Sequence, residues 1–224
     1  MSSAFRILAC TFAAARFAES PPGVRLVRMT TSSLPLFPLS SVLFPEGNLS
    51  LRIFEPRYLD LVRDCARSDS GFGVCLILDG QEAGQPAVPA AVGTLARITD
   101  FHTLPDGLLG IHARGGERFH VLNTRVRDNG LILGDVEFFE DEEVVAVPAD
   151  CGLLATILER VHEQVGGEIS LIDRARYDDA GWVGYRLAEV LPLELPERQQ
   201  LLQINDPIER LGQLMHHLPR FQRA

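Results

Sequence analysis

The spacing of the apolar residues changes once along this chain, between residues 145 and 148. Before that point, apolar side chains alternate with polar ones in short runs separated by turn residues, which is typical of β-strands. After it they recur every three or four residues, as in amphipathic helices. With 224 residues, 46% of them hydrophobic, the chain can bury the core of one large domain or two small ones. The pattern predicts an α+β fold, with strands in residues 33–147 and a helical bundle in residues 148–224.

The first part carries the signals of several strands and one helix. Two prolines inside residues 34–39 exclude a helix there and favour an extended edge segment. A helix is predicted to begin at Pro56, because proline suits the first helical position, and to end before Gly71. Turn residues at 105–107 and 129–130 predict hairpins. Short strands joined by hairpins favour a barrel-like or curled sheet, with the apolar stripe of the helix packed on it.

The second part has the pattern of a small helical bundle. The predicted helices cover residues 153–165, 185–191, 196–204 and a segment that Asp206 caps and Pro207 begins. An acidic run at residues 140–143 precedes them. We interpret this run as a solvated strand end or linker, because it lacks the spaced oxygen ligands and the turn glycine of a calcium loop.

Every one of the 21 basic residues is an arginine, against 30 Asp and Glu. The absence of lysine excludes a P-loop, a Ser-Lys catalytic pair and Schiff-base chemistry, since each needs an amine. The signatures of serine hydrolases, zinc peptidases and dinucleotide-binding folds are also absent. Gly115-Gly116 is better interpreted as a bulge or turn than as a phosphate loop, because no helix start follows. We therefore expect no enzyme, no catalytic residue, no metal ligand and no cofactor.

The start of the chain differs from the rest in charge. The first 28 residues carry four arginines and one acidic residue, so the remainder of a chain with net charge −9 has a net charge of −12. The apolar stretch at 7–15 is too short to cross a bilayer, and the region before Cys10 is shorter than a signal peptide needs. We interpret residues 1–32 as a disordered leader, or as sequence upstream of a true start at Met29. The irregular spacing of the four cysteines favours reduced thiols in a cytoplasmic protein. The net charge of −12 makes an anionic membrane an unfavourable partner.

One set of motifs is more specific than this background. Residues 34–39 read LPLFPL, residues 42–45 read VLFP, and residues 51–58 read LRIFEPRY. In this order they resemble the N-terminal substrate-recognition domain of the ATP-dependent Lon protease, which also occurs as a stand-alone protein and within cereblon. Further similar segments follow at residues 72–74, 92–94, 104–107, 116–119 and 186–214, and at Trp182. Glu46 departs from the pattern, because the family usually has glycine directly after the VLFP segment.

The resemblance implies a PUA-like β-barrel with one packed helix, followed by an α-helical bundle, which agrees with the apolar spacing. It also implies a recognition role, because this domain binds unfolded or degron-bearing polypeptide and helps the enzyme to oligomerise. Lon adds an ATPase module and a Ser-Lys protease module, and we expect neither in a lysine-free chain of this length. The leading hypothesis is a non-catalytic polypeptide-binding module. Its expected partners are unfolded polypeptide or another protein, with weak homo-oligomerisation.

Seven residues are candidates for the binding site. They are Arg52, Phe54, Glu55, Arg57, Tyr58, Arg118 and Phe119. The polar candidates either contact a ligand or tie neighbouring elements together through charge-assisted hydrogen bonds. The apolar signature residues are expected mainly in the core; these are Leu36, Phe37, Phe44, Leu51, Ile53 and Phe54. A groove between barrel and bundle is the expected location of the site.

Two other classes of function compete with polypeptide binding. PUA-like barrels often hold RNA, but the net charge of −12 and the lack of an arginine cluster make nucleic acid an unfavourable partner. An enzyme acting on a small molecule would need a carboxylate or histidine site that the motifs do not reveal. RNA retention that depends on salt would favour the first alternative, and stabilisation by a metabolite would favour the second.

Overall fold

The structure, a computed structural model, describes residues 32–166 and 172–221, so the predicted leader lies outside it except for Ser32. Six strands and one helix occupy the first of these ranges up to residue 138. They are β1 (Ser32–Leu39), β2 (Asn48–Ile53), α1 (Pro56–Ser68), β3 (Phe72–Asp79), β4 (Val88–Thr103), β5 (Leu109–Val126) and β6 (Ile132–Phe138). The strand order is β2-β5-β4-β3-β1-β6, and β5 also pairs with β6. The sheet therefore closes into a ring, to which β2 is added along the first part of β5.

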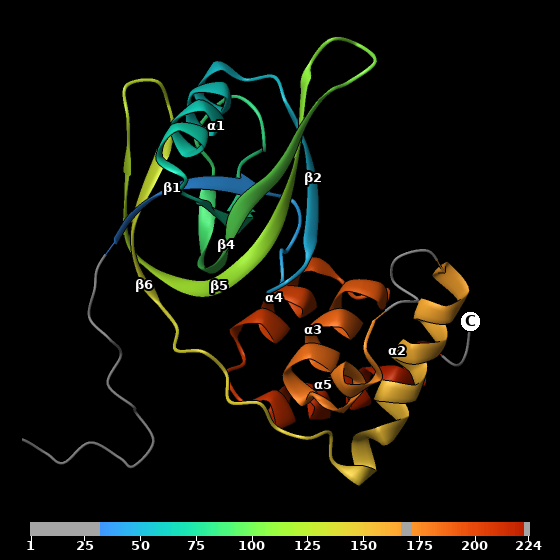
Figure 1. Ribbon diagram of the computed structural model, residues 1–224. Helices are drawn as coiled ribbons and strands as arrows, with labels where there is room; N and C mark the ends of the chain where they lie inside the picture. Colours follow the sequence, from blue (N-terminus) through green and yellow to red (C-terminus); the bar gives the residue numbers. More distant parts are fainter. Residues whose placement is uncertain (1–31, 167–171, 222–224) are drawn as a thin grey trace, which may run out of the picture.

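Strand β5 is the longest, with 18 residues, and it pairs with three other strands (Figure 1). Thr94 of β4 pairs with Arg118, and Ala96 pairs with Gly115. Two residues of β5, Gly116 and Glu117, therefore lie opposite the single residue Leu95 of β4. This is the bulge that Gly115-Gly116 predicted. From the turn signals and the glycine pair we expect two separate strands, at residues 108–114 and 119–127. They are one continuous strand, because a bulge bends a strand without ending its pairing.

Helix α1 begins at Pro56, as predicted. Its inward residues include Leu61, Val62 and Cys65, which pack in one cluster with Phe37 of β1 and Phe72 of β3. The helix ends at a left-handed residue with φ of 49°, Asp69, whose N–H donates to the Cys65 carbonyl. The prediction of one helix packed on the sheet is confirmed.

The second part of the chain is helical. Its elements are η1 (Ala149–Cys151), α2 (Gly152–Val165), η3 (Arg174–Asp178), α3 (Ala180–Val190), α4 (Leu195–Gln203) and α5 (Pro207–Phe221). Helix α5 is capped as predicted, since the Asp206 carboxylate accepts from the Ile208 N–H at 2.8 Å. Helix α3 begins five residues earlier than predicted. Asp179 caps α3 by accepting from the N–H groups of Gly181 and Trp182. The glycines at the start of this helix obscured the helical spacing of its apolar residues.

One of the hydrophobic clusters extends from the ring into the helices. The largest buried cluster joins residues of α2 to α5 with Val42, Phe44, Leu76, Ala90 and Val92 of the first part. The helices gather at one end of the ring, away from α1 (Figure 1). The predicted α+β class is confirmed. No helix in residues 32–166 or 172–221 is long and apolar enough to cross a membrane.

The expected core residues are buried with two exceptions. Leu36, Phe37, Phe44 and Ile53 are at most 6% exposed, and Leu51 is partly buried. Phe54 is 55% exposed, so the expectation that it belongs to the core is wrong. It lies between the last residue of β2 and the first turn of α1, where the strand alternation has ended.

Candidate functional site

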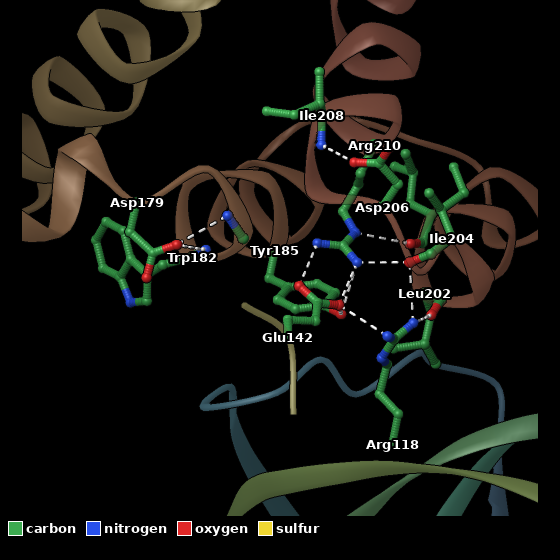
Figure 2. Close-up of polar contacts among 12 residues, drawn as sticks. Arg118, Glu142, Asp179, Trp182, Tyr185, Leu202, Ile204, Asp206, Ile208 and Arg210 are labelled. Atoms are coloured by element: carbon green, nitrogen blue, oxygen red, sulfur yellow. Dashed lines mark hydrogen bonds and ion pairs between the residues drawn. The ribbon is translucent and has the colours of Figure 1, made fainter. Parts of the chain in front are cut away.

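Four polar side chains meet where the ring contacts the helices. Arg118 comes from β5, Glu142 from the segment after β6, Tyr185 from α3 and Arg210 from α5 (Figure 2). Glu142 accepts from Arg210 at 2.5 and 3.0 Å and pairs with Arg118 at 2.8 Å. The Tyr185 hydroxyl donates to Glu142 and accepts from Arg210 at 2.8 Å. This group, which we call the junction network, attaches a strand and two helices to one carboxylate.

Backbone carbonyls at the end of α4 accept hydrogen bonds from both guanidinium groups. Arg118 donates to the carbonyls of Leu202 and Ile204 at 2.7 and 3.0 Å. Arg210 donates to those of Leu201 and Ile204 at 3.2 and 2.6 Å. The last carbonyls of a helix have no partner within it. The two arginines therefore satisfy the end of α4 while Glu142 holds them in place.

The junction network is buried and carries more positive than negative charge. The side chains of Arg210 and Arg118 are 0% and 4% exposed, and they share one carboxylate. Desolvation lowers the pKa of Arg118, and the neighbouring charge of Arg210 acts in the same direction. Burial raises the pKa of Tyr185, so its hydroxyl stays a donor. This arrangement fixes the placement of ring and helices.

A cleft of about 420 Å³ lies beside the junction network, where a groove between the two parts was expected. Its walls come from the loop before β2, the bulge of β5, the segment after β6 and the start of α3. Phe139, Trp182 and Tyr185 provide aromatic surface. The charged lining residues are Glu46, Glu117, Arg118, Glu140, Asp141, Glu142, Glu143, Arg176 and Asp179. A concave surface that combines aromatic side chains with polar groups is typical of a ligand site.

The backbone conformation at Glu46 shows why the family usually has glycine at this position. Its φ is 60°, a left-handed conformation that favours glycine, which is the residue the family usually has there. In this chain the carboxylate pairs with Arg176 at 2.6 Å and with Arg114 at 3.1 Å. The substitution thus places an acidic side chain in the wall of the cleft and links β5 to η3.

The structure places only one of the seven candidates, Arg118, in the wall of the cleft. The next residue, Phe119, is 0% exposed and packs inside the ring with Leu36, Leu95 and Val136. Arg118 and Phe119 are adjacent in sequence, but they lie on opposite faces of β5.

The other five candidates lie around the junction of β2 and α1. Arg57 is buried, donates to the Gly130 carbonyl at 3.2 Å and pairs with Glu55 at 3.0 Å. Tyr58 is buried and stacks on Phe37, with ring centroids 3.9 Å apart. Arg57 thus ties the helix start to the β5–β6 turn by a charge-assisted hydrogen bond, with Glu55 as its counterion, which is one of the two alternatives that the sequence left open. Two candidates are exposed: Arg52, which pairs with Asp106, and Phe54.

Sequence reasoning missed most of the residues that line the cleft. Glu142 stands in an acidic run that we interpreted as solvated, and nothing local distinguishes it from its neighbours. Arg210 follows the Asp206 cap by one turn and lies on a helix whose apolar stripe points inward. An arginine between the apolar residues of such a stripe was the available signal for a buried ion pair.

The described residues offer no metal centre. No group of three or more His, Cys, Asp or Glu within residues 32–166 and 172–221 is placed to hold a metal ion. Cys65, Cys75 and Cys151 are unpaired and buried, and burial raises the pKa of Cys75 to about 12, which makes it a poor nucleophile. Cys10 lies outside the described residues.

Glu189 on α3 predicts a pH dependence of stability. Burial raises its pKa from 4.5 to about 7, although Arg186 pairs with it at 3.0 Å. The folded protein then holds a proton that the unfolded chain releases, so stability falls as the pH rises between about 4.5 and 7. We expect Glu189→Gln to reduce the loss of stability between pH 5 and pH 8 by up to about 3 kcal/mol. Urea unfolding at both pH values measures this difference. Glu163→Gln, an exposed control, should leave it unchanged.

The fold and the site together define a class of protein: a ring of strands and a helical bundle, fixed to each other by buried arginines, with a charged aromatic cleft between them. Residues 33–220 match the substrate-binding domain of ATP-dependent protease La (LON). The chain therefore belongs to the Lon substrate-binding domain family, as its motifs indicated.

Known proteins of this family share the fold with this chain. A crystal structure of a Lon N-terminal domain protein from Xanthomonas campestris is 50% identical and has a TM-score of 0.71, covering 83% of this chain and 98% of that one. The N-terminal domain of a Mycobacterium avium complex Lon protease is 14% identical with a TM-score of 0.62, covering 83% and 97%, and shows the fold alone.

Full-length relatives are much longer than this chain. Lon protease of Cytophaga hutchinsonii is 25% identical over 194 residues, which are 82% of this chain and 24% of that protein. A LON peptidase N-terminal domain and RING finger protein of Schizosaccharomyces pombe is 25% identical over 230 residues, covering 86% and 46%. The chain thus spans about a quarter of the length of the Lon protease and under half of the RING finger protein.

Proposed function

We propose that this chain is a non-catalytic polypeptide-binding module that acts in the cytoplasm. The observation that carries the proposal is the match of residues 33–220 to a substrate-binding domain. The expected partner is an unfolded or degron-bearing polypeptide, or a protein partner that presents an extended segment. Binding, and not chemistry, is the role that a lysine-free sequence without catalytic motifs supports.

The cleft is the proposed site of binding. Its volume of about 420 Å³ suits a few side chains of an extended segment, and its aromatic walls supply apolar contact. Val144 adds apolar surface at its edge and is 84% exposed. An RNA phosphate would face many carboxylates in this cleft, so the charge of the lining favours polypeptide over RNA.

Binding to a permanently unfolded, fluorescently labelled model protein tests the proposal. We expect micromolar affinity and suppression of aggregation by the full chain. Val144→Ser removes apolar surface at the cleft and is expected to weaken binding about three- to tenfold. Val126→Ser is the matched control, because Val126 is also exposed, at 55%, and lies outside the cleft lining. Fluorescence anisotropy measures the affinity of all three proteins.

Three results would overturn the proposal. The first is absence of both binding and aggregation suppression at micromolar concentration. The second is salt-dependent retention of RNA in place of polypeptide, which would favour the RNA-binding alternative. The third is a thermal shift with a metabolite that is lost in Arg118→Gln or Glu55→Gln, which would favour an enzyme acting on a small molecule.

A further inference from the structure

The cleft has an excess of carboxylates over cations. Its lining contains seven acidic residues and two arginines, Arg118 and Arg176. Three of the seven acidic residues are already engaged. Glu142 belongs to the junction network, Asp179 caps α3, and Glu46 pairs with two arginines. Burial would raise the pKa of Glu46, but its bond to Arg176 and the charges of Arg176, Arg114 and Arg186 lower it, so the carboxylate stays charged.

Three further carboxylates face the cleft without a cation. Glu117, Glu140 and Asp141 are exposed, and none has a hydrogen bond or an ion pair with another residue of the ranges 32–166 and 172–221. Glu117 belongs to the β5 bulge, and the other two come directly after Phe139. The two arginines do not neutralise these three carboxylates, because both are paired elsewhere, Arg118 with Glu142 and Arg176 with Glu46.

The aromatic walls already hold guanidinium groups of this chain. The guanidinium of Arg176 lies 5.1 Å from the centre of the Trp182 ring, and that of Arg118 lies 4.8 Å from the centre of the Phe139 ring. These distances are within the range of attractive cation–π contacts. Arg176 shows the complete arrangement, because its guanidinium contacts an aromatic face and pairs with a carboxylate of the same cleft. The cleft therefore already accommodates a cationic side chain between an aromatic ring and a carboxylate.

We propose that the cleft selects polypeptide segments by a cationic side chain, arginine or lysine, which lies against its aromatic wall and pairs with Glu117, Glu140 or Asp141. This specificity rests on the proposed function and narrows it from unfolded polypeptide in general to segments with a positive charge among apolar residues. An acidic segment would meet the same carboxylates with repulsion. The apolar neighbours of the cation supply affinity, and the cation supplies selection.

Labelled peptides of about 12 residues provide the probe, each with one central variable position in an apolar, otherwise uncharged sequence. Arginine, lysine, citrulline and glutamate occupy that position in turn. Citrulline has the shape of arginine without its charge, so it isolates the electrostatic contribution. At 0.15 M salt, where remote charges are screened, we expect the citrulline peptide to bind about tenfold more weakly than the arginine peptide. The lysine peptide should bind like the arginine peptide, and the glutamate peptide most weakly.

A triple variant locates the selection in the cleft. Glu117→Gln, Glu140→Gln and Asp141→Asn together change only exposed carboxylates without partners among the described residues, so the fold is retained. We expect this variant to lose the preference for arginine over citrulline while still binding the citrulline peptide. The matched control neutralises three exposed carboxylates outside the cleft lining, Asp69→Asn, Asp128→Asn and Glu163→Gln. It should keep the preference, because it makes the net charge less negative by the same amount but leaves the carboxylates of the cleft in place.

The outcomes separate the two proposals. If unfolded protein binds but the arginine and citrulline peptides bind equally, the charge selection is wrong and the binding function stands. If the control variant loses the preference as fully as the cleft variant, net charge and not the cleft is responsible, and the selection is again overturned. If neither unfolded protein nor any peptide binds, both proposals fail.

Discussion

Glu142→Ala is expected to lower the free energy of unfolding by about 3–5 kcal/mol, because it leaves two buried guanidinium groups without their counterion. Arg118 and Arg210 are almost completely buried and share this single carboxylate. Their bonds to the carbonyls at the end of α4 remain, but those carbonyls carry no net charge to offset two cations. Glu142→Gln, which keeps an acceptor of similar shape, should give an intermediate loss. Chemical denaturation at neutral pH measures all three proteins.

Asp141→Ala is the matched control for this prediction. Asp141 is the preceding residue, exposed and without a partner among the described residues, so its removal should change stability by no more than about 0.5 kcal/mol. Equal effects of the two alanine variants would show that the junction network contributes no more to stability than a surface charge. The assignment of Arg118 to a fixing role would then be withdrawn.

Phe119→Ala should be destabilising to a similar degree, by about 3–5 kcal/mol, because it leaves a cavity inside the ring. The ring of this phenylalanine occupies space that two glycines leave open. A Cβ on Gly73 would approach its Cζ atom to 2.6 Å, and one on Gly93 would approach it to 2.7 Å. Phe119→Leu retains most of the volume and should cost less than about 1.5 kcal/mol. Urea unfolding of both variants measures the difference.

Phe101→Ala is the control, since Phe101 is 47% exposed and its loss should cost only about 0.5 kcal/mol. The Phe119 variants also test a site residue suggested by the sequence. Phe119→Leu is expected to bind unfolded polypeptide as the parent chain does. A variant with nearly unchanged stability and lost binding would assign Phe119 to the binding surface after all.

The sequence indicated most of the elements because their signals are local. Pro56 and the Asp206-Pro207 pair begin helices through the conformation of one or two residues, and Gly130 makes a hairpin turn with φ of 83°. The start of α3 was missed because its first residues include Gly181 and Gly184, which carry no apolar signal. Two strands were predicted in place of the continuous β5, because a glycine pair occurs both at bulges and at the ends of strands.

The site was harder to predict, because its residues are brought together only by the tertiary structure. Arg118 and the carbonyl of Leu202 are 84 residues apart in the chain, and Glu142 and Arg210 are 68 apart. No spacing rule connects such positions. The family motifs from which the candidates were chosen lie mainly around β2 and α1, and most of those residues stabilise that junction. Pro45, Arg118 and Trp182 of the cleft lining also belong to similar segments, but the acidic residues after β6 belong to none. The groove between the two parts was predicted from general reasoning about pockets, and its acidic character was not.

Because the residues of the junction network are far apart in the sequence, the ribosome synthesises them at different times. The strands of the ring leave the ribosome first, then Glu142, and Arg210 only 68 residues later. Until α4 has been made, Arg118 lacks the carbonyls to which it donates, and until α5 has been made, Glu142 lacks Arg210 and the apolar cluster around Phe44 is incomplete. A nascent or prematurely terminated chain therefore presents an open apolar surface to chaperones and proteases, as incomplete folds do. The junction network is therefore complete only after the last helix of the domain has been synthesised.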